Sequence, residues 1–216
     1  QEDGENVPVP DRMIHHWVGS GYVPGVKLER LMAWIQNYDS HYKYFKEVKA
    51  SKLLAREGDE FKIYLRLQRK RKFITVFFNS DHTARHCHHN ARRMSSFSFT
   101  TKIAELKEPD TEQETGKPSS QDRGFLWRLN SYWRFQEDEA GVFVECESVS
   151  LSRVIPFGLK WLMRGIVESV PQESLKNTLT SIREEVTKDL QKARQNFPAP
   201  THPAQSAAFH TDISSP

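Results

Sequence analysis

The sequence predicts an α+β fold in which an antiparallel sheet of six to seven strands is covered by one long C-terminal helix. Two observations predict this fold. Apolar residues recur at every second position from Phe125 to Phe135 and again from Val142 to Cys146, which is the period of half-buried strands. After Arg153 the apolar spacing becomes helical and leaves no room for another strand. A sheet that ends in a helix laid across its face encloses either a solid core or a cavity.

The two alternating runs are joined by a polar turn at 137–141 and form a predicted hairpin. One face carries the large apolar side chains of Trp127, Trp133 and Phe135, interrupted only by Ser131. The other face is charged and holds Arg128, Tyr132, Arg134, Glu145 and Glu147. We interpret the charged face as the solvated outer surface, because buried charges are costly. The alternative is a polar cavity floor, on which the arginines hold a carboxylate or phosphate headgroup and a glutamate acts as a base.

The C-terminal helix is predicted from one apolar stripe, which consists of Leu175, Leu179, Ile182, Val186 and Leu190. Ser169 and Gln172 resemble a capping box with Pro171 in the first turn, so the helix is predicted to start near residue 170. Upstream, residues 157–168 are apolar nearly all round and include Trp161 and Met163. Burial on two sides is the favoured interpretation of that segment, and contact with a membrane surface is the alternative.

The first half of the chain supplies the remaining elements. Residues 13–23 read as the first strand, which Pro24 and Gly25 end. Two short helices are predicted next, at 28–35 and 38–45, from an apolar helical face and a run of aromatic residues. Strands follow, separated by turns, and the clearest alternation is that of Phe61, Ile63, Leu65 and Leu67. Further strands are predicted at 73–79 and 95–106.

Length and composition indicate one domain. The chain has 216 residues, of which 37% are hydrophobic, and this is enough for a sizeable core. Residues 1–11 are predicted to be a flexible segment, 12–195 the domain and 196–216 a disordered tail, because both ends lack apolar periodicity. Residues 107–123 are polar and are predicted to form a mobile loop between strands.

The charge pattern says little in favour of nucleic acid. The net charge of +3 is small, and aromatic residues do not alternate with basic ones along a strip. The dense basic run at 69–72 is interpreted as a hairpin tip, with anionic lipid headgroups as the alternative partner. Both segments, 69–72 and 157–168, are candidates for transient membrane contact, although no stretch approaches the roughly 20 apolar residues of a membrane span. The chain begins with Gln1, as expected after loss of a leader or after trimming, and we favour an exported or periplasmic location over a cytoplasmic one.

Histidine is the residue type that most invites a catalytic or metal-binding interpretation. His82, His86, His88 and His89 lie within eight positions, and His86 and His88 would share one strand face. No third ligand is evident nearby, apart from His15 or His16 on the first strand. We therefore interpret the cluster as solvated strand residues and predict no metal and no cofactor. The two cysteines, Cys87 and Cys146, lie on predicted strands without zinc-type spacing.

Several segments resemble the START-like (SRPBCC) superfamily, which includes polyketide cyclases, dehydrases and Coq10-type lipid carriers. They are LERLMAWIQNYDSHYKYF from residue 28, TVFFN from 75, GFLWRLNSYWRF from 124, VECESVSLSRVIPFGL from 144 and SVPQESL from 169. The resemblance covers about residues 12–192 and is greatest to uncharacterised bacterial members. It implies a helix-grip fold, in which a curved antiparallel sheet wraps the C-terminal helix and leaves a hydrophobic tunnel.

The resemblance implies binding of a hydrophobic or amphipathic small molecule such as a lipid, with transport as an extension of that role. Because no catalytic motif stands out, we favour binding without catalysis and name no catalytic residue. A cyclase, dehydratase or hydrolase acting on an aromatic or polyketide-like substrate in the same tunnel is the first alternative. The second is an interaction module whose cavity is closed by side chains. The residues predicted to bind the ligand are Trp127, Arg128, Tyr132, Trp133, Arg134, Glu147, Trp161, Leu179 and Ile182.

Overall fold

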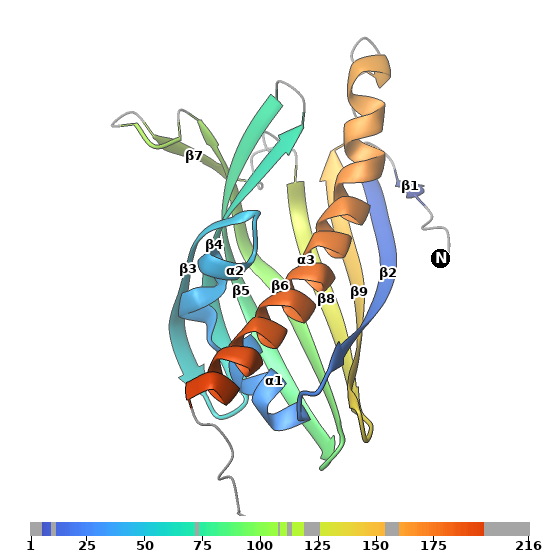
Figure 1. Cartoon of the computed structure of the whole chain (residues 1–216). Coiled ribbons are helices and arrows are strands. Elements are labelled where there is room, and N and C mark those ends of the chain that lie inside the picture. The colour runs from blue at the N-terminus through green and yellow to red at the C-terminus, as the bar shows by residue number, and fades with distance from the viewer. Residues whose placement is uncertain are drawn as a thin grey trace, which may run out of the picture.

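The fold is a single curved antiparallel sheet wrapped around a long helix, as Figure 1 shows. The computed structural model describes residues 6–9, 12–71, 74–107, 109–111, 114–118, 126–153 and 160–196. The strands run in the order β1-β2-β9-β8-β6-β5-β4-β3, and β7 pairs with β6. The seven long strands are β2 (Arg12–Pro24), β3 (Val48–Glu57), β4 (Glu60–Arg71), β5 (Ile74–Asn90), β6 (Arg93–Lys107), β8 (Leu126–Glu137) and β9 (Gly141–Arg153). This is the predicted α+β helix-grip arrangement.

Two four-residue strands extend the sheet beyond the prediction. Strand β1 (Asn6–Val9) lies in the N-terminal segment and pairs with the start of β2. Strand β7 (Thr115–Pro118) lies in the segment predicted to be a mobile loop. Arg66 on β4 fixes the described part of that segment, because its guanidinium contacts Glu114 at 2.6 Å and Asp110 at 2.9 Å.

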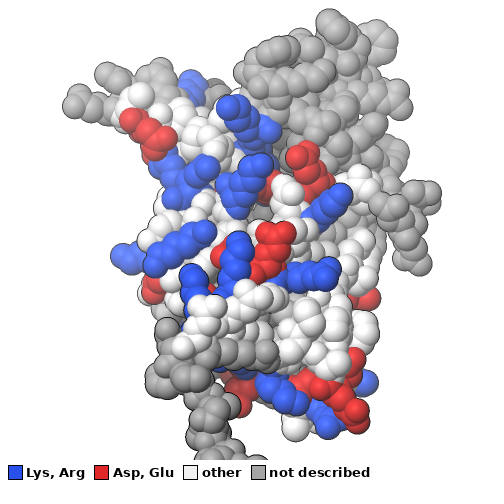
Figure 2. All heavy atoms as spheres, viewed as in Figure 1, with Lys and Arg blue, Asp and Glu red and all other residues white. Residues whose placement is uncertain are grey.

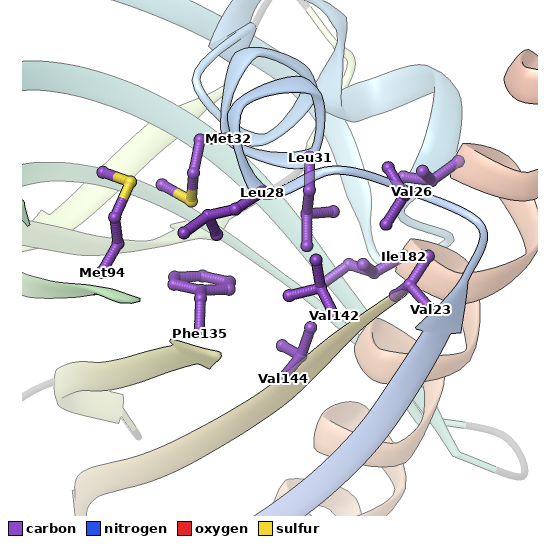
Figure 3. Packing of buried hydrophobic residues seen from close by; sticks show 11 residues of the cluster. Val23, Val26, Leu28, Leu31, Met32, Met94, Phe135, Val142, Val144 and Ile182 are labelled. Carbon is purple, nitrogen blue, oxygen red and sulfur yellow. The ribbon is translucent and has the colours of Figure 1, made fainter. Parts of the chain in front are cut away.

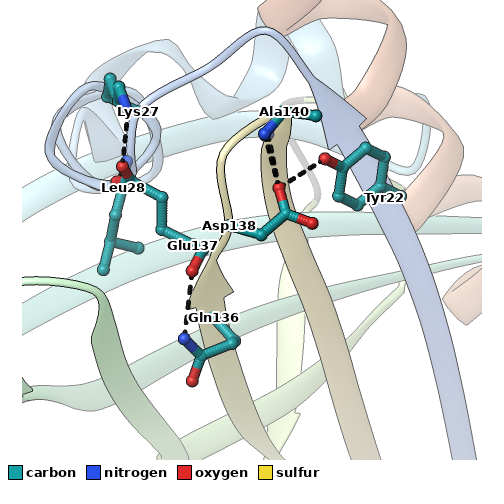
Figure 4. Close-up of polar contacts among 8 residues, drawn as sticks. Tyr22, Lys27, Leu28, Gln136, Glu137, Asp138 and Ala140 are labelled. Atoms are coloured by element: carbon teal, nitrogen blue, oxygen red, sulfur yellow. Dashed lines mark hydrogen bonds and ion pairs between the residues drawn. The ribbon is translucent and has the colours of Figure 1, made fainter.

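The predicted pair of short helices after the first strand is present. Helix α1 (Leu28–Ile35) and helix α2 (His41–Tyr44) are separated by the 3-10 turn η1 (Tyr38–Ser40). Helix α1 begins against the β8–β9 turn, where the Glu137 carboxylate accepts the Leu28 N–H at 2.7 Å and contacts Lys27 Nζ at 2.9 Å (Figure 4). A carboxylate at this position satisfies a free backbone donor of the first turn and complements the helix dipole.

Helix α3 (Lys160–Asn196) crosses the concave face of the sheet and is longer than predicted. Its start near residue 170 was predicted wrongly, since the turn that resembles a capping box lies inside a continuous helix. Pro171 is therefore an interior helical residue and removes one backbone donor from the helix. No helix among the described residues is both long and apolar enough to cross a membrane.

The β8–β9 hairpin turns its charged face outward, as predicted from the cost of burying charges. Phe135, Val142, Val144 and Cys146 are buried at 2% exposure or less, whereas Tyr132 and Phe143 are more than 40% exposed. Arg134 forms ion pairs with Glu145 and Glu147 on the outer face. The apolar face of the hairpin is thus the one that helix α3 covers.

The largest buried cluster closes one end of the space between sheet and helix. In Figure 3, Leu28, Leu31 and Met32 of α1 point toward Phe135 and Val142 of the hairpin, and Ile182 of α3 completes the packing. Two smaller clusters lie elsewhere along the sheet, one around Phe61 and Ile63 and one around Leu67 and Phe78. The space between these clusters is available for a cavity.

Candidate functional site

A cavity of about 220 Å³ lies between the concave face of the sheet and helix α3. Its walls come from β4, β5, β6, β8 and β9, from the α1–α2 region and from the middle of α3. Its lining includes Tyr38, Phe45, Lys46, Glu47, Ile63, Arg69, His82, Ala84, Ser98, Ser131, Trp133, Phe135, Cys146, Ser148, Ser174 and Ile182. Lys46 is the exposed residue among the described lining residues, so the cavity reaches the surface beside it.

The floor of the cavity is a row of small side chains. Ala84 pairs with Ser98, Ser98 with Ser131, and Ser131 with Ser148, so the row crosses four neighbouring strands. Alternate residues of a strand face the same side of the sheet, and these four face helix α3. Positions that face a helix normally carry large apolar side chains. Small residues at these four positions leave space above the sheet and line it with three hydroxyl groups.

The hydroxyl groups of this row have capacity for further hydrogen bonds. Ser131 Oγ accepts the indole N–H of Trp133 at 3.1 Å, which leaves the Ser131 hydroxyl hydrogen available. The side chains of Ser98 and Ser148 form no hydrogen bond with any residue that the structure describes. A hydroxyl group facing a cavity can donate to or accept from a ligand or water.

One end of the cavity is charged. Arg69 Nη1 lies 2.6 Å from Glu47 Oε2, and their side chains are only 19% and 21% exposed. Ser174 on α3 donates its hydroxyl hydrogen to the same carboxylate oxygen at 2.5 Å. Burial lowers the pKa of Arg69 and the Glu47 charge opposes this effect, but a guanidinium remains protonated in proteins. The contacts join α3 to strand β4 and to the chain before β3.

The other end is apolar, with a few buried neutral polar groups. Tyr38, Phe61, Ile63 and Ala84 form one cluster, and the Tyr38 hydroxyl lies 3.0 Å from His86 Nε2. Burial raises the pKa of the Tyr38 hydroxyl and of the Cys146 thiol well above their ordinary values. Cys146 therefore lines the cavity as a neutral thiol and is a poor nucleophile at neutral pH.

The histidines on β5 do not behave as a solvated group, which corrects the sequence interpretation for two of them. His82 and His86 are 4% and 1% exposed, while His88 and His89 are less buried near the strand end. Ser80 donates its hydroxyl hydrogen to Leu65 O, so it accepts the N–H of His82 Nε2 at 3.0 Å. Burial lowers the pKa of both His82 and His86 to about 4. Within the described part of the chain, no three His, Cys, Asp or Glu side chains are placed to hold a metal ion.

Two of the predicted ligand-binding residues line the cavity. Trp133 lies on its sheet wall, where its ring stacks on Phe135 with 6.2 Å between the ring centroids. Ile182 lies on its helix wall. Trp127 lies in the β-bulge at the start of β8 and is covered by the Arg12 guanidinium, 4.5 Å from its ring centroid. Leu179 packs near Gly19 where α3 meets β2.

The other predicted residues lie away from the cavity lining. Arg128, Tyr132, Arg134 and Glu147 belong to the outer face of the hairpin, because their strand positions alternate with those that face α3. There Arg128 donates to Thr100 O at 3.1 Å, and Glu147 contacts His16 at 2.9 Å. The Trp161 side chain lies outside the described residues.

Sequence reasoning missed the charged end and the serine row. Glu47, Arg69 and Ser174 come from three distant parts of the chain, and each alone resembles an ordinary surface residue. Arg69 in particular was assigned to a hairpin tip, whereas its side chain joins the cavity wall. The serines had a usable signal, because Ser131 interrupts an apolar run and Ser98 and Ser148 have the same inward parity.

The fold was compared with known proteins. No protein-family model matches the sequence, and a search of curated proteins finds no significant match. Among solved structures, the protein TTHA0849 from Thermus thermophilus is 20% identical, has a TM-score of 0.55, and the match covers 81% of this chain and 98% of that one. The ZhuI aromatase/cyclase from Streptomyces sp. R1128 is 11% identical with a TM-score of 0.55, covering 83% and 98%. A STAR-related lipid transfer protein from Xanthomonas axonopodis is 13% identical with a TM-score of 0.52, covering 86% and 99%.

These matches extend over most of each chain at identities of 20% and below, so the information they carry is about the fold. In this chain the curved antiparallel sheet, the helices after the first long strand and the helix across the concave face form an α+β helix-grip arrangement. The chain therefore has the START-like (SRPBCC) helix-grip fold.

Proposed function

We propose that this protein binds a hydrophobic or amphipathic small molecule, such as a lipid, in the cavity between the sheet and helix α3. The observation that carries the proposal is the polarity of the cavity. Glu47 and Arg69 form a charged end near the surface, whereas Ile63, Phe135 and Ile182 form an apolar interior. An amphipathic ligand would bury its apolar part in the interior and place its polar group near the charged end.

The volume limits the size of the enclosed ligand. Ligand pockets commonly have volumes of roughly 300–1,000 Å³. This cavity, at about 220 Å³, is smaller. It suits a small molecule, or one part of a longer molecule whose remainder extends past Lys46. The likeness of the fold to a lipid transfer protein and to an aromatase/cyclase supports a ligand role without naming the ligand.

The most direct test is to purify the full chain from its native host, extract it with organic solvent and analyse the extract by mass spectrometry. One recurring compound at a stoichiometric amount would support the proposal. Its retention should depend on the cavity, so the same extraction is repeated on a variant that fills the cavity. Equal amounts of the compound in both proteins would place the ligand elsewhere and contradict the proposal.

Ser98→Leu is the cavity-filling variant, and Ser95→Leu is its matched control on the same strand. Ser98 lies in the floor row, whereas Ser95 has the opposite parity and pairs with Arg134 of the outer face. Filling empty space with an apolar side chain should stabilise the ligand-free protein by about 2 kcal/mol and raise its Tm by about 4–8 °C. Ser95→Leu should change the Tm by no more than about 1 °C and should leave ligand retention unchanged.

Chemical conversion of a ligand is the second candidate, and one observation favours it. His82 lines the cavity as a neutral imidazole whose Nε2 is bonded to Ser80, so its Nδ1 has a lone pair available. A base or acceptor in that position could assist a cyclisation or dehydration. If the extracted compound changes during incubation, His82→Gln should abolish the change; Glu147→Gln, on the outer face, should not affect it.

Transport would add a membrane-contact step to binding. The side chains of 157–168 lie outside the described residues, and Arg69 of the basic run is part of the cavity wall. Membrane contact therefore stays a prediction. Its measurement is co-sedimentation of the full chain with anionic vesicles, with neutral vesicles as control.

A further inference from the structure

The charged end of the cavity has more donors than its own contacts use. A guanidinium has five N–H groups. The described contacts of Arg69 engage Nη1 alone, at 2.6 Å to Glu47 Oε2 and 3.5 Å to Gln68 O. The N–H groups of Nε and Nη2 have no partner among the described residues. Ser174 holds the Glu47 carboxylate and Glu47 in turn holds the guanidinium, which belongs to the cavity wall.

The charges at this end do not cancel. Glu47 offsets one of the two cations, Arg69 and Lys46, and one net positive charge remains. Lys46 lines the cavity where it reaches the surface and has no acidic partner in the part of the chain that the structure describes. A cation at the mouth and a fixed guanidinium in the wall favour a ligand group with one negative charge.

Further lysines lie on the surface near the mouth. Lys43 on α2 and Lys49 and Lys52 on β3 are exposed, and none has an ion-pair partner among the described residues. Figure 2 shows Lys and Arg side chains gathered on the α2–β3 side of this face. Lysines on an edge strand also discourage pairing with a strand of another molecule. This explanation applies to Lys49 and Lys52, which lie on the edge strand β3. Lys46 precedes the strand, and the combined field would raise the local concentration of anions at the mouth.

We propose that the ligand is an amphipathic monocarboxylate, with its carboxylate at Arg69 and Lys46 and its apolar part directed along β4 toward Ile63. This inference rests on the proposed function and names its ligand class. Arg69 and Ile63 are six residues apart on one strand, about 20 Å. The free edge of a guanidinium matches a planar carboxylate, and the single net positive charge matches its single negative charge. The strand register places the serine row level with Phe61, just beyond Ile63, where its hydroxyl groups face the far end of a long ligand.

The test compares three ligands with the same tail: octanoate, octanol and octylammonium. Each is titrated into the full chain at pH 7.5 while amide NMR signals are followed, which yields both Kd and location. Octanoate should bind at least about 10-fold more tightly than octanol, and octylammonium more weakly than octanol. Perturbed signals should include Leu67 and Leu65, which line the cavity next to Arg69 on β4.

Substitutions then separate charge recognition from general packing. Lys46→Gln should weaken octanoate about 3- to 10-fold and leave octanol unchanged; Lys49→Gln, outside the cavity, is the matched control. In the double variant Lys46→Gln/Arg69→Gln only Glu47 remains charged, so the preference should reverse toward octylammonium. Lys46 is exposed, so its substitution tests the inference even if loss of Arg69 prevents folding.

The outcomes distinguish the two proposals. Equal affinity for octanoate and octanol, or an octanoate preference unaffected by Lys46→Gln, would overturn the monocarboxylate inference while leaving cavity binding intact. A wild-type preference for octylammonium would also overturn it and would assign the head-group site to Glu47. If all three ligands leave the cavity signals unperturbed, the proposed function fails together with the inference.

Discussion

Mild acid should destabilise this protein, because three buried histidines are neutral in the folded state. His41, His82 and His86 are 9%, 4% and 1% exposed. Burial lowers the pKa of each to about 4. The hydrogen bond that His41 Nε2 donates to Ile35 O at 2.7 Å opposes this lowering of the His41 pKa, but burial is the larger effect.

The sign and size of the effect follow from the two pKa values. In the unfolded chain a histidine has a pKa of about 6.5, so it takes up a proton before the folded form does. The stabilising contribution is therefore complete above about pH 6.5 and is lost as the pH falls toward 4. Between pH 7.5 and 5.5 each histidine lowers the free energy of unfolding by about 1.4 kcal/mol, or about 4 kcal/mol for three. Total stabilities are commonly about 5–15 kcal/mol, so the loss is large.

Carboxylates do not obscure this window. Hydrogen bonds lower the pKa of Glu114, Glu137 and Asp138 below ordinary values. Their stabilising contribution is present above the unfolded pKa of about 4 and is lost only at lower pH. A stability loss between pH 7.5 and 5.5 can thus be assigned to histidine.

The assay is urea unfolding at pH 7.5 and 5.5, followed by circular dichroism. His82→Gln should reduce the acid-induced loss from about 4 to about 3 kcal/mol, since one titrating group is removed. His88→Gln, on the same strand but outside the buried set, should leave the full loss. A wild-type loss below about 1 kcal/mol would refute the assignment of buried neutral histidines, and an equal loss in His82→Gln would remove His82 from the effect.

Two further predictions concern the packing of the helices. A Cβ at Gly19 would lie 2.9 Å from Leu179 Cδ1 of α3, whereas one at Gly21 meets nothing within 4 Å. Gly19→Ala should therefore destabilise by about 1–2 kcal/mol and Gly21→Ala stabilise by up to about 1 kcal/mol in urea unfolding; equal effects would contradict the close approach. Glu137→Gln should lower the Tm by about 2–4 °C in thermal unfolding, because it weakens the contacts to Lys27 and Leu28 at the start of α1. Glu139→Gln, exposed in the same turn, should not, and a similar shift in both would assign the effect to surface charge.

The sheet and the long helix were predictable because their signals are periodic and local. Strand β8 was evident from the alternation of Trp127, Leu129, Trp133 and Phe135, and the stripe of α3 from residues 175–190. The helix start was not predictable in the same way. Ser169, Pro171 and Gln172 have the spacing found at helix starts. The same spacing is also compatible with a position inside a helix, and in the structure these residues lie inside α3.

The charged end of the cavity could not be predicted from local patterns. Glu47, Arg69 and Ser174 are brought together by the path of β4 across the sheet and by the angle at which α3 crosses it. Each residue alone is a common surface type, and nothing in its neighbours marks it. The burial of His82 and His86 was missed as well, because alternation places them on one strand face with Ala84 but does not show that this face packs against Tyr38 and Phe61.

The interruption of the hairpin pattern at Ser131 is the feature that decides between a solid core and a cavity. A core-facing position on a central strand normally carries a large apolar side chain, and a serine there is unfavourable unless something occupies the space above it. One such serine is a local exception. Here the strand register places Ser98, Ser131 and Ser148 side by side and adds Ala84, so four adjacent strands omit a large side chain at one level of the sheet. Close packing would otherwise fill that level, so the row is the sequence signature of the cavity, and Ser98→Leu tests the ligand-binding role that we propose for it.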